Sequence, residues 1–301
     1  MIKRNSYLKT LTFSIFFLVS SGLFTACKKE TKSIRFGIIT DLHYADRENV
    51  GNRHCSESIK KLKEAMTVFK NDSLDFIIEL GDFKDQGKIP NRNESLHFLD
   101  AIEEIFQSSS LPAYHVLGNH DMDCISKKDF LSHTNNSGAA KGKNYYAFKV
   151  HGIKCIVLDA NYNKDGSDYD KGNFDWTYAA IPDTQRNWLV KELKDGDEPI
   201  LIFIHQLLNE KTDPLVRVHN AKEIRLLLTQ SNRVLAVFQG HHHVGGYEKE
   251  DGIHYLTIPG AIEGSYPENN SYAIVELSPS GDISIDGYSK CPDRTLKKEI
   301  H

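Results

Sequence analysis

The sequence predicts a layered α/β domain. Apolar runs of strand length alternate with segments whose apolar residues recur at helical spacing, and after about residue 250 short alternating runs separated by turn residues replace this pattern. With 301 residues and 40% hydrophobic content, the chain can bury a sizeable core and lies near the upper size of one domain. We therefore expect a single domain over residues 34–301.

Six apolar runs predict the central strands. They are residues 34–40, 75–80, 113–117, 153–158, 200–204 and 234–239. Each run has the length of one strand and is apolar almost throughout, which favours burial within a sheet.

Four segments between the strands predict helices. Apolar residues recur at helical spacing in residues 59–69 and 96–106, so each segment presents one apolar face. A third helix is expected to begin at Asn220, where an N-cap amide precedes Glu223 at the capping-box offset. A fourth is expected to follow Pro182.

The C-terminal part predicts hairpins in place of strand-helix units. Alternating runs occupy residues 252–262, 271–277 and 283–288, with Ser280-Gly281 at a turn, and residues 145–150 and 153–158 predict a further hairpin with a turn at His151-Gly152. The one long irregular segment is residues 161–181. Its aromatic residues favour an ordered, functional loop over a disordered one.

The first 27 residues differ in character from the rest. Lys3 and Arg4 precede an apolar run over residues 11–24, which is the pattern of a signal peptide. The alternative, a permanent anchor helix, is disfavoured because the run is short and interrupted by Ser and Gly. Residues 23–27 resemble the lipobox of bacterial lipoproteins, which implies cleavage after residue 26, a lipid on Cys27 and a tether over residues 27–33.

This pattern predicts an exported protein, lipid-anchored to a bacterial membrane on its periplasmic or cell-surface side. Ordinary cleavage after Ala26, giving a free soluble protein, is the alternative. The net charge of -4 and pI near 6.4 exclude the basic field that polymeric nucleic acids require. Four cysteines remain after Cys27 without CxxC spacing, so neither a zinc knuckle nor a redox motif is predicted.

Polar side chains follow five of the apolar runs at their carboxyl ends. In chain order they are Asp41, His43, Asp82, Asn119, His120, Asp121, His205, His241 and His243. Because open α/β sheets bind ligands at this edge, we expect these side chains to converge. One such residue alone is more often a helix cap or a hydrogen-bonded histidine, and it is the set that points to a site.

Seven of these residues are candidate metal ligands: Asp41, His43, Asp82, Asn119, His205, His241 and His243. Oxygen and imidazole donors without a thiolate suit Mn, Fe, Zn or Mg rather than a soft metal. So many ligands imply two divalent ions. Asp82 stands centrally in the order and is expected to bridge them.

The motif order D-x-H, G-D, G-N-H-D, H and G-H-x-H resembles the calcineurin-like metallophosphoesterase superfamily from about Ile34 to the C-terminus. The resemblance implies a four-layer α/β/β/α sandwich and a hydroxide between two metals that attacks phosphorus. It implies two ligand sets: Asp41, His43, Asp82 and His243 for one metal, and Asp82, Asn119, His205 and His241 for the other. It also implies that His120 stabilises the developing charge or protonates the leaving oxygen, while Asp121 fixes its tautomer.

Several segments are similar to the manganese-dependent ADP-ribose/CDP-alcohol diphosphatases. They are residues 41–46, 53–58, 240–247, 259–263 and 291–296. This resemblance implies cleavage of a nucleoside diphosphate linkage in a small metabolite, with manganese as the first choice of metal and iron or zinc as alternatives. It implies Arg53 as a phosphate partner and residues 161–181 as a base-stacking wall, and Tyr247 is a further candidate for the pocket.

Two departures and two alternatives keep the function open. His43 and the segment 81–85 differ from some members of that group, which affects metal preference and substrate range. A general phosphomonoesterase or cyclic-nucleotide phosphodiesterase would share the same metal chemistry. A non-catalytic metal-binding lipoprotein is the alternative of another class, and His120 beside a complete ligand set argues against it, since a binding site needs no positioned acid.

Overall fold

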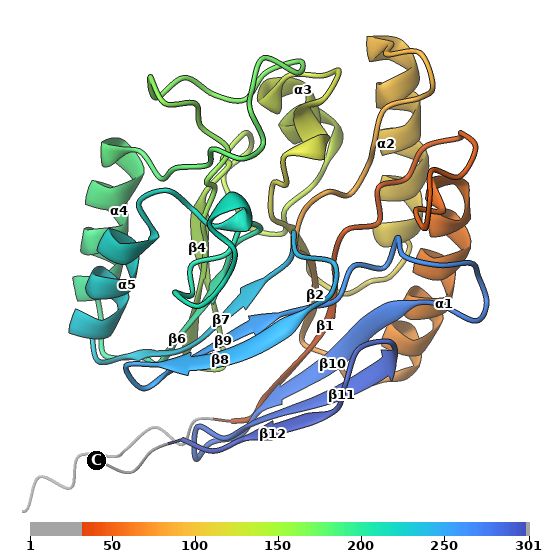
Figure 1. The fold of residues 1–301 in the computed structure, drawn as a ribbon. Coiled ribbons are helices and arrows are strands. Elements are labelled where there is room, and N and C mark those ends of the chain that lie inside the picture. The colour runs from red at the N-terminus through yellow and green to blue at the C-terminus, as the bar shows by residue number, and fades with distance from the viewer. Residues whose placement is uncertain (1–31, 299–301) are drawn as a thin grey trace, which may run out of the picture. The chain divides into compact units, whose positions relative to one another are not determined.

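The computed structural model describes residues 32–298, whose strands form two six-stranded sheets (Figure 1). The first sheet has the order β12-β11-β10-β1-β2-β3 and contains β1 (Ile34–Ile39), β2 (Phe76–Glu79), β3 (Ala113–His115), β10 (Ser271–Leu277), β11 (Ile283–Ser289) and β12 (Arg294–Leu296). The second has the order β4-β5-β6-β7-β9-β8 and contains β4 (Tyr146–Val150), β5 (Ile153–Val157), β6 (Ile200–Phe203), β7 (Val234–Gln239), β8 (Gly246–Glu250) and β9 (Ile253–Thr257).

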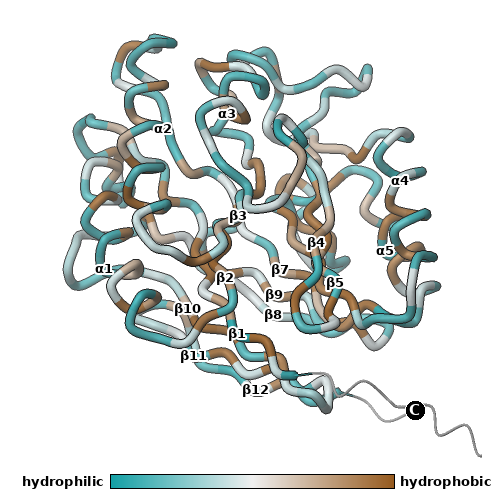
Figure 2. Tube along the Cα trace, turned by 180° about the vertical axis from the view of Figure 1, so that it is seen from behind, coloured by the Kyte–Doolittle hydropathy of each residue, from teal (hydrophilic) through white to brown (hydrophobic). Residues whose placement is uncertain are grey.

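Helices cover the outer face of each sheet. The first sheet buries the apolar faces of α1 (Ser58–Asn71), α2 (Arg92–Phe106) and α3 (Lys127–His133), and the second buries those of α4 (Asp183–Lys194) and α5 (Ala221–Gln230). Figure 2 shows hydrophobic residues along β1 and β2, and hydrophobic and hydrophilic residues alternating along α4 and α5. The layers are α/β/β/α, so the predicted sandwich is confirmed.

The inner layer between the sheets is an aromatic core. Phe36 and Phe76 stack with ring centroids 4.8 Å apart, and Phe36 also meets Phe203 and Phe238 of the other sheet edge-on at 5.7 and 5.5 Å. All four rings are fully buried, and each contributes roughly 1.5–3 kcal/mol by leaving water. This packing fixes the two sheets face to face, and with them the loops at the ends of their strands.

The strands that matter for function run parallel within each sheet. In the first sheet β1, β2 and β3 are parallel, and in the second β5, β6 and β7 are parallel. Parallel strands deliver their carboxyl ends to one edge, so the polar residues after them emerge at a common edge of each sheet.

The predicted elements are present with ends that shift by a few residues, and three short elements were not predicted. The helix α3 is capped by Ser126 and Asp129 in a capping box, and β8 and β12 lie at the outer edges of the sheets, where charged residues are typical. The capping prediction at Asn220 is wrong. The helix α5 does begin directly after Asn220, but the Asn220 side chain does not cap it. Its Oδ1 atom accepts from the Ile181 nitrogen at 3.0 Å, and its Nδ2 atom donates to the Ile181 oxygen at 2.8 Å.

The predicted signal peptide, Cys27 and most of the tether lie outside the described residues. Within residues 32–298, none of the helices combines the length and the apolar character needed to cross a bilayer.

Candidate metal centre

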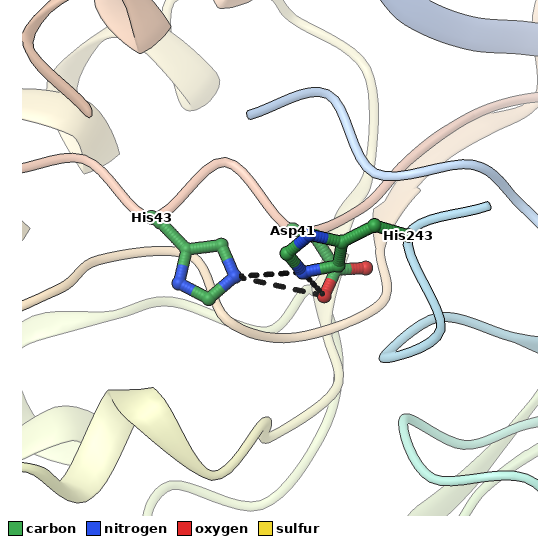
Figure 3. Close-up of side chains that lie close together, drawn as sticks. All are labelled: Asp41, His43 and His243. Carbon is green, nitrogen blue, oxygen red and sulfur yellow. Dashed lines mark hydrogen bonds and ion pairs between the residues drawn. The ribbon is translucent and has the colours of Figure 1, made fainter. Parts of the chain in front are cut away.

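The predicted ligands after β1 and β7 meet in a first cluster (Figure 3). The Asp41 Oδ1 atom lies 3.3 Å from His243 Nε2 and 3.7 Å from His43 Nε2. The two imidazole nitrogens face each other at 3.2 Å. Three metal-type donor atoms from segments about 200 residues apart in sequence therefore surround one point.

A second cluster forms from the loops after β2, β6 and β7. Asp82 Oδ2 lies 3.2 Å from His205 Nε2, and His241 completes a group of donor atoms within 4.8 Å of one another. The same Asp82 oxygen lies 3.5 Å from His43 Nε2 of the first cluster. One carboxylate thus stands between the two groups, as the sequence order suggested.

The orientation of these side chains fits divalent cations. Five buried atoms of the candidate ligands have no hydrogen-bond partner: Asp41 Oδ1, His43 Nδ1, Asn119 Oδ1, His205 Nε2 and His241 Nε2. Unpaired buried acceptors are rare in proteins because they are costly. The other nitrogen of the His205 ring pairs with the backbone oxygen of Leu80 at 2.7 Å, which fixes the tautomer that leaves Nε2 free as a ligand.

The backbone at this edge adopts an uncommon conformation. Asp41, His43, Asp82 and His241 have positive φ angles of 52, 46, 52 and 64°. Left-handed backbone costs on the order of 1 kcal/mol or more for residues other than Gly and clusters at functional sites. Gly118 is required here because a Cβ atom on it would lie 2.1 Å from the Asp82 nitrogen.

Charges within the clusters are strongly coupled. Burial opposes ionisation of Asp41, but the charges and hydrogen bonds of His243, His43 and His205 together hold the Asp41 pKa well below its usual value. Burial likewise opposes protonation of His205, yet Asp82 raises the His205 pKa to about 10. Burial and the charge of His205 lower the His241 pKa to about 3. The carboxylates therefore favour positive charge at this edge of the sheets. In the absence of metal that charge is carried by protons on imidazoles such as His205, and divalent cations would replace those protons.

His120 lies at the mouth of the site, with 29% of its side chain exposed. Its ring centroid is 4.7 Å from that of His43, and its backbone nitrogen donates to Asp82 Oδ1 at 2.7 Å. Its Nδ1 atom pairs with Asp123 Oδ2 at 2.7 Å. Burial opposes protonation of His120, but Asp82 and Asp123 raise its pKa to about 9, so the ring carries a proton at neutral pH.

The predicted role of Asp121 is wrong. Its buried carboxylate points away from His120 and accepts backbone N–H groups of Gly118 at 2.8 Å, Phe83 at 2.9 Å and Asp82 at 3.1 Å. Asp121 thus joins the loop that carries Asp82 to the loop that carries His120. The contact with the imidazole belongs to Asp123, which lies three residues after His120 across a 3-10 turn.

Two further carboxylates support the site. Asp85 is 2% exposed and lies between His43 Nδ1, at 3.6 Å, and His120 Nδ1, at 3.9 Å. Glu263 pairs with His243 Nδ1 at 2.7 Å. The only sequence signal for Asp85 and Asp123 is their spacing of three residues after Asp82 and His120.

Of the two residues predicted to contact the substrate, Arg53 lies near the clusters and Tyr247 does not. Arg53 forms an antiparallel bridge with Glu263 and therefore lies beside the first cluster. Tyr247 lies on the edge strand β8, where its hydroxyl pairs with His254 at 3.0 Å and Arg294 lies 5.2 Å from its ring centroid. Among the described residues, these contacts place Tyr247 with the sheet edge rather than with the ligands. Trp176 belongs to the aromatic segment 161–181, which the resemblance implied as a base-stacking wall, and its ring centroid lies 6.1 Å from that of His241.

The sandwich and the paired clusters define a metal-dependent phosphoesterase. The family model described as "Calcineurin-like phosphoesterase" matches residues 34–245, and the chain belongs to that family. The family predicted from the motifs is thereby confirmed.

Sequence relatives align with nearly the whole chain. Proteins named manganese-dependent ADP-ribose/CDP-alcohol diphosphatase are 23% identical in Homo sapiens, covering 88% of this chain and 93% of the relative, and 24% identical in Oryza sativa, covering 92% and 98%. A crystal structure of a dimetal phosphatase from Danio rerio matches with a TM-score of 0.77 and 22% identity, covering 88% of this chain and 99% of that one. That structural match supports the fold.

Proposed function

We propose that this enzyme uses two divalent ions, manganese first, to hydrolyse the diphosphate linkage of nucleoside diphosphate derivatives such as ADP-ribose or CDP-alcohols. The main support is the position of Asp82 Oδ2, which lies 3.5 Å from His43 Nε2 and 3.2 Å from His205 Nε2. A carboxylate shared between two imidazole clusters suits a pair of cations about 3.5–4 Å apart. The names and coverage of the relatives favour the diphosphate substrate.

The ligand sets follow the two clusters. Asp41, His43, Asp82 and His243 would hold one ion, and Asp82, Asn119, His205 and His241 the other. When bound, the two ions would supply a nucleophile derived from water at neutral pH and positive charge for the phosphoryl oxygens.

The chain's own residues would orient the substrate and handle the proton. Arg53 lies beside the first cluster and offers a guanidinium to the non-reacting phosphate. His120 would donate its Nε2 proton to the leaving phosphate oxygen, since Asp123 occupies Nδ1 and the ring is protonated at neutral pH. Asp123 would hold the ring in that orientation.

Trp176 supports a nucleoside-bearing substrate. Its side chain is 48% exposed beside His241. The loop that carries it is anchored, because Tyr169 and Phe174 stack at 4.2 Å and the Gly172 nitrogen donates to the Met122 oxygen at 2.9 Å. An exposed indole on an anchored loop offers a flat face on which a base can stack.

Product analysis tests the proposal. Purified protein with Mn²⁺ should release AMP and ribose 5-phosphate from ADP-ribose, and CMP and phosphocholine from CDP-choline. Inorganic phosphate from simple esters, or cleavage of cyclic nucleotides, without cleavage of either diphosphate would favour the general phosphoesterase alternative. No turnover of any phosphate compound by protein loaded with two ions would favour the binding lipoprotein.

We also propose that the mature enzyme is held at a bacterial membrane by a lipid on Cys27. The support is the basic N-terminus, the apolar run and the sequence Leu23-Phe24-Thr25-Ala26-Cys27. Incorporation of labelled fatty acid should be lost in Cys27→Ala, and a labelled variant would contradict the assignment of that cysteine.

A further inference from the structure

Glu263 connects segments that are far apart in the sequence and meet beside the first cluster. Its Oε1 atom pairs with His243 Nδ1 at 2.7 Å, and its Oε2 atom accepts from Asn52 Nδ2 at 2.7 Å. Its backbone oxygen accepts from Lys290 Nζ at 3.0 Å. One carboxylate therefore has one oxygen on a predicted metal ligand and the other on the loop that follows β1.

The contact with His243 controls how that ring faces the site. A Cβ atom on Gly260 would lie 2.9 Å from His243 Cγ, so the backbone of Gly260 packs directly against the ring. With Nδ1 paired to Glu263, the Nε2 atom points to Asp41 Oδ1 at 3.3 Å. A carboxylate on the far nitrogen of a ligating imidazole fixes the ring and raises its basicity.

The second arm of Glu263 holds the segment that contains Arg53. Gly264 donates its backbone N–H to Asn52 at 2.8 Å, and His54 donates to Ile262 at 3.2 Å, so residues 52–54 and 262–264 form a short antiparallel pair. Arg53 stands opposite Glu263 in this pair. The Asn52 side chain adds a direct bond from this segment to the Glu263 carboxylate, with Nδ2 donating to Oε2 at 2.7 Å.

We propose that Glu263 is a positioning residue with two tasks: it holds His243 for the metal and fixes the Asn52–Arg53 segment for the substrate phosphate. Metal affinity and phosphate binding are then linked through one side chain. The first task requires only that the clusters bind metal, and the second rests on the proposed function.

Metal titration of matched variants tests the first task. Glu263→Ala should weaken binding of one of the two Mn²⁺ ions by about 10- to 100-fold. At a free Mn²⁺ concentration that fills both sites of the parent, the parent should give the electron paramagnetic resonance spectrum of a coupled Mn²⁺ pair. Glu263→Ala should give the signal of a single Mn²⁺ ion at the same concentration. Glu263→Gln keeps an acceptor oxygen and should fall between the parent and Glu263→Ala. If Glu263→Ala does not fold, the Mn²⁺ affinity of Glu263→Gln provides the test instead.

Two controls separate positioning from loop stability. Asn52→Ala removes only the second arm and should keep both Mn²⁺ affinities within about twofold, because the contact with His243 is intact, while KM for ADP-ribose rises and kcat changes little. Glu268→Ala removes an exposed carboxylate from the same loop and should match the parent in both measurements. Thermal melts of all four variants confirm folding.

The outcomes distinguish this inference from the proposed function. If folded Glu263→Ala and Glu263→Gln bind two Mn²⁺ ions as tightly as the parent, Glu263 does not position the ligand. If Asn52→Ala loses Mn²⁺ as strongly as Glu263→Ala, loop integrity explains the effect and the inference fails. A parent that binds two Mn²⁺ ions but does not cleave ADP-ribose or CDP-choline would overturn the proposed substrate while leaving the metal result for Glu263 standing.

Discussion

Two buried clusters contain carboxylates and imidazoles, one within the first sheet and its helices and one between the loops of the two sheets, and they differ in how their atoms are paired. In one, His115 Nδ1 faces Glu79 at 2.8 Å and Nε2 faces Glu103 at 3.0 Å. In the other, His43 Nε2 faces His243 Nε2 at 3.2 Å. A ring between two carboxylates forms a charge-balanced group, whereas two ring nitrogens that face each other can share a proton or bind a cation. Residue types alone do not distinguish a structural cluster from a metal site, but the convergence of several donor atoms within 4.8 Å of one another does, and it is found around His43 and His205 rather than around His115.

The largest effect is expected from Asp82→Asn. The variant neutralises the carboxylate shared by both clusters, so hydrolysis should fall by roughly 10³-fold. Its free energy of unfolding in metal-free buffer should change less than that of a variant at His115. Steady-state kinetics and urea unfolding measure the two quantities. An Asp82→Asn enzyme with near-parental turnover would remove the distinction between the clusters.

The converse is expected at the structural cluster. His115→Gln leaves Glu79 and Glu103 buried without their cation, which should cost about 3–5 kcal/mol of unfolding free energy. The metal-binding loops are not altered, so kcat of the folded fraction should stay within about twofold of the parent. A loss of kcat comparable to that of Asp82→Asn would show that this cluster belongs to the chemistry.

A pH series sharpens the same point. Burial opposes protonation of His115, but Glu103 and Glu79 raise its pKa to about 10. Since the unfolded value is about 6.5, its contribution to stability is fully present below about pH 6.5 and is lost as the pH rises toward 10. The difference in unfolding free energy between parent and His115→Gln, measured in chelator from pH 6 to 10, should therefore shrink. A difference that stays constant across this range would contradict a charged His115.

His120 is expected to show an intermediate effect. His120→Ala should lower kcat by about 10²-fold if the ring supplies a proton, while Mn²⁺ stoichiometry stays at the parental value. Asp123→Asn should lower kcat less, because the ring remains but loses its charged partner at 2.7 Å. Parental kcat in folded His120→Ala would exclude proton donation by this residue.

The convergence of the candidate ligands could be predicted from the sequence, and the contacts that hold these side chains in place could not. Apolar runs show where strands end, so Asp41, Asp82 and His205 were predicted at one edge with their chain order intact. Which carboxylate meets which ring depends on loop conformation. The His120 ring contacts Asp123 rather than the adjacent Asp121, because a 3-10 turn brings the residue three positions after His120 next to it.

The positive φ angles of the site also depend on loop conformation that the sequence does not reveal. They arise where segments distant in sequence must approach closely, and no local pattern announces them. The short helix α3 and the edge strands β8 and β12 were not predicted because they bury too few apolar residues to give a periodic pattern in the sequence.

The smallest effect is expected at Trp176. Stacking of one base contributes about 1–3 kcal/mol, and the low end of that range corresponds to a rise of roughly fivefold in KM for ADP-ribose in Trp176→Ala, with kcat retained. Small phosphate esters without a base should show no such rise, which separates stacking from damage to the metal clusters.

Fluorescence gives an independent measurement of that contact. The chain has two tryptophans, and in a Trp188→Phe background only Trp176 emits. Trp188 packs on Tyr145, away from the clusters, so its replacement should leave activity unchanged. AMP should quench the remaining emission and inorganic phosphate should not, because only AMP carries a base to stack on the indole. Equal quenching by both would mean that Trp176 senses the phosphate site rather than the base, and the wall of the pocket would have to lie elsewhere.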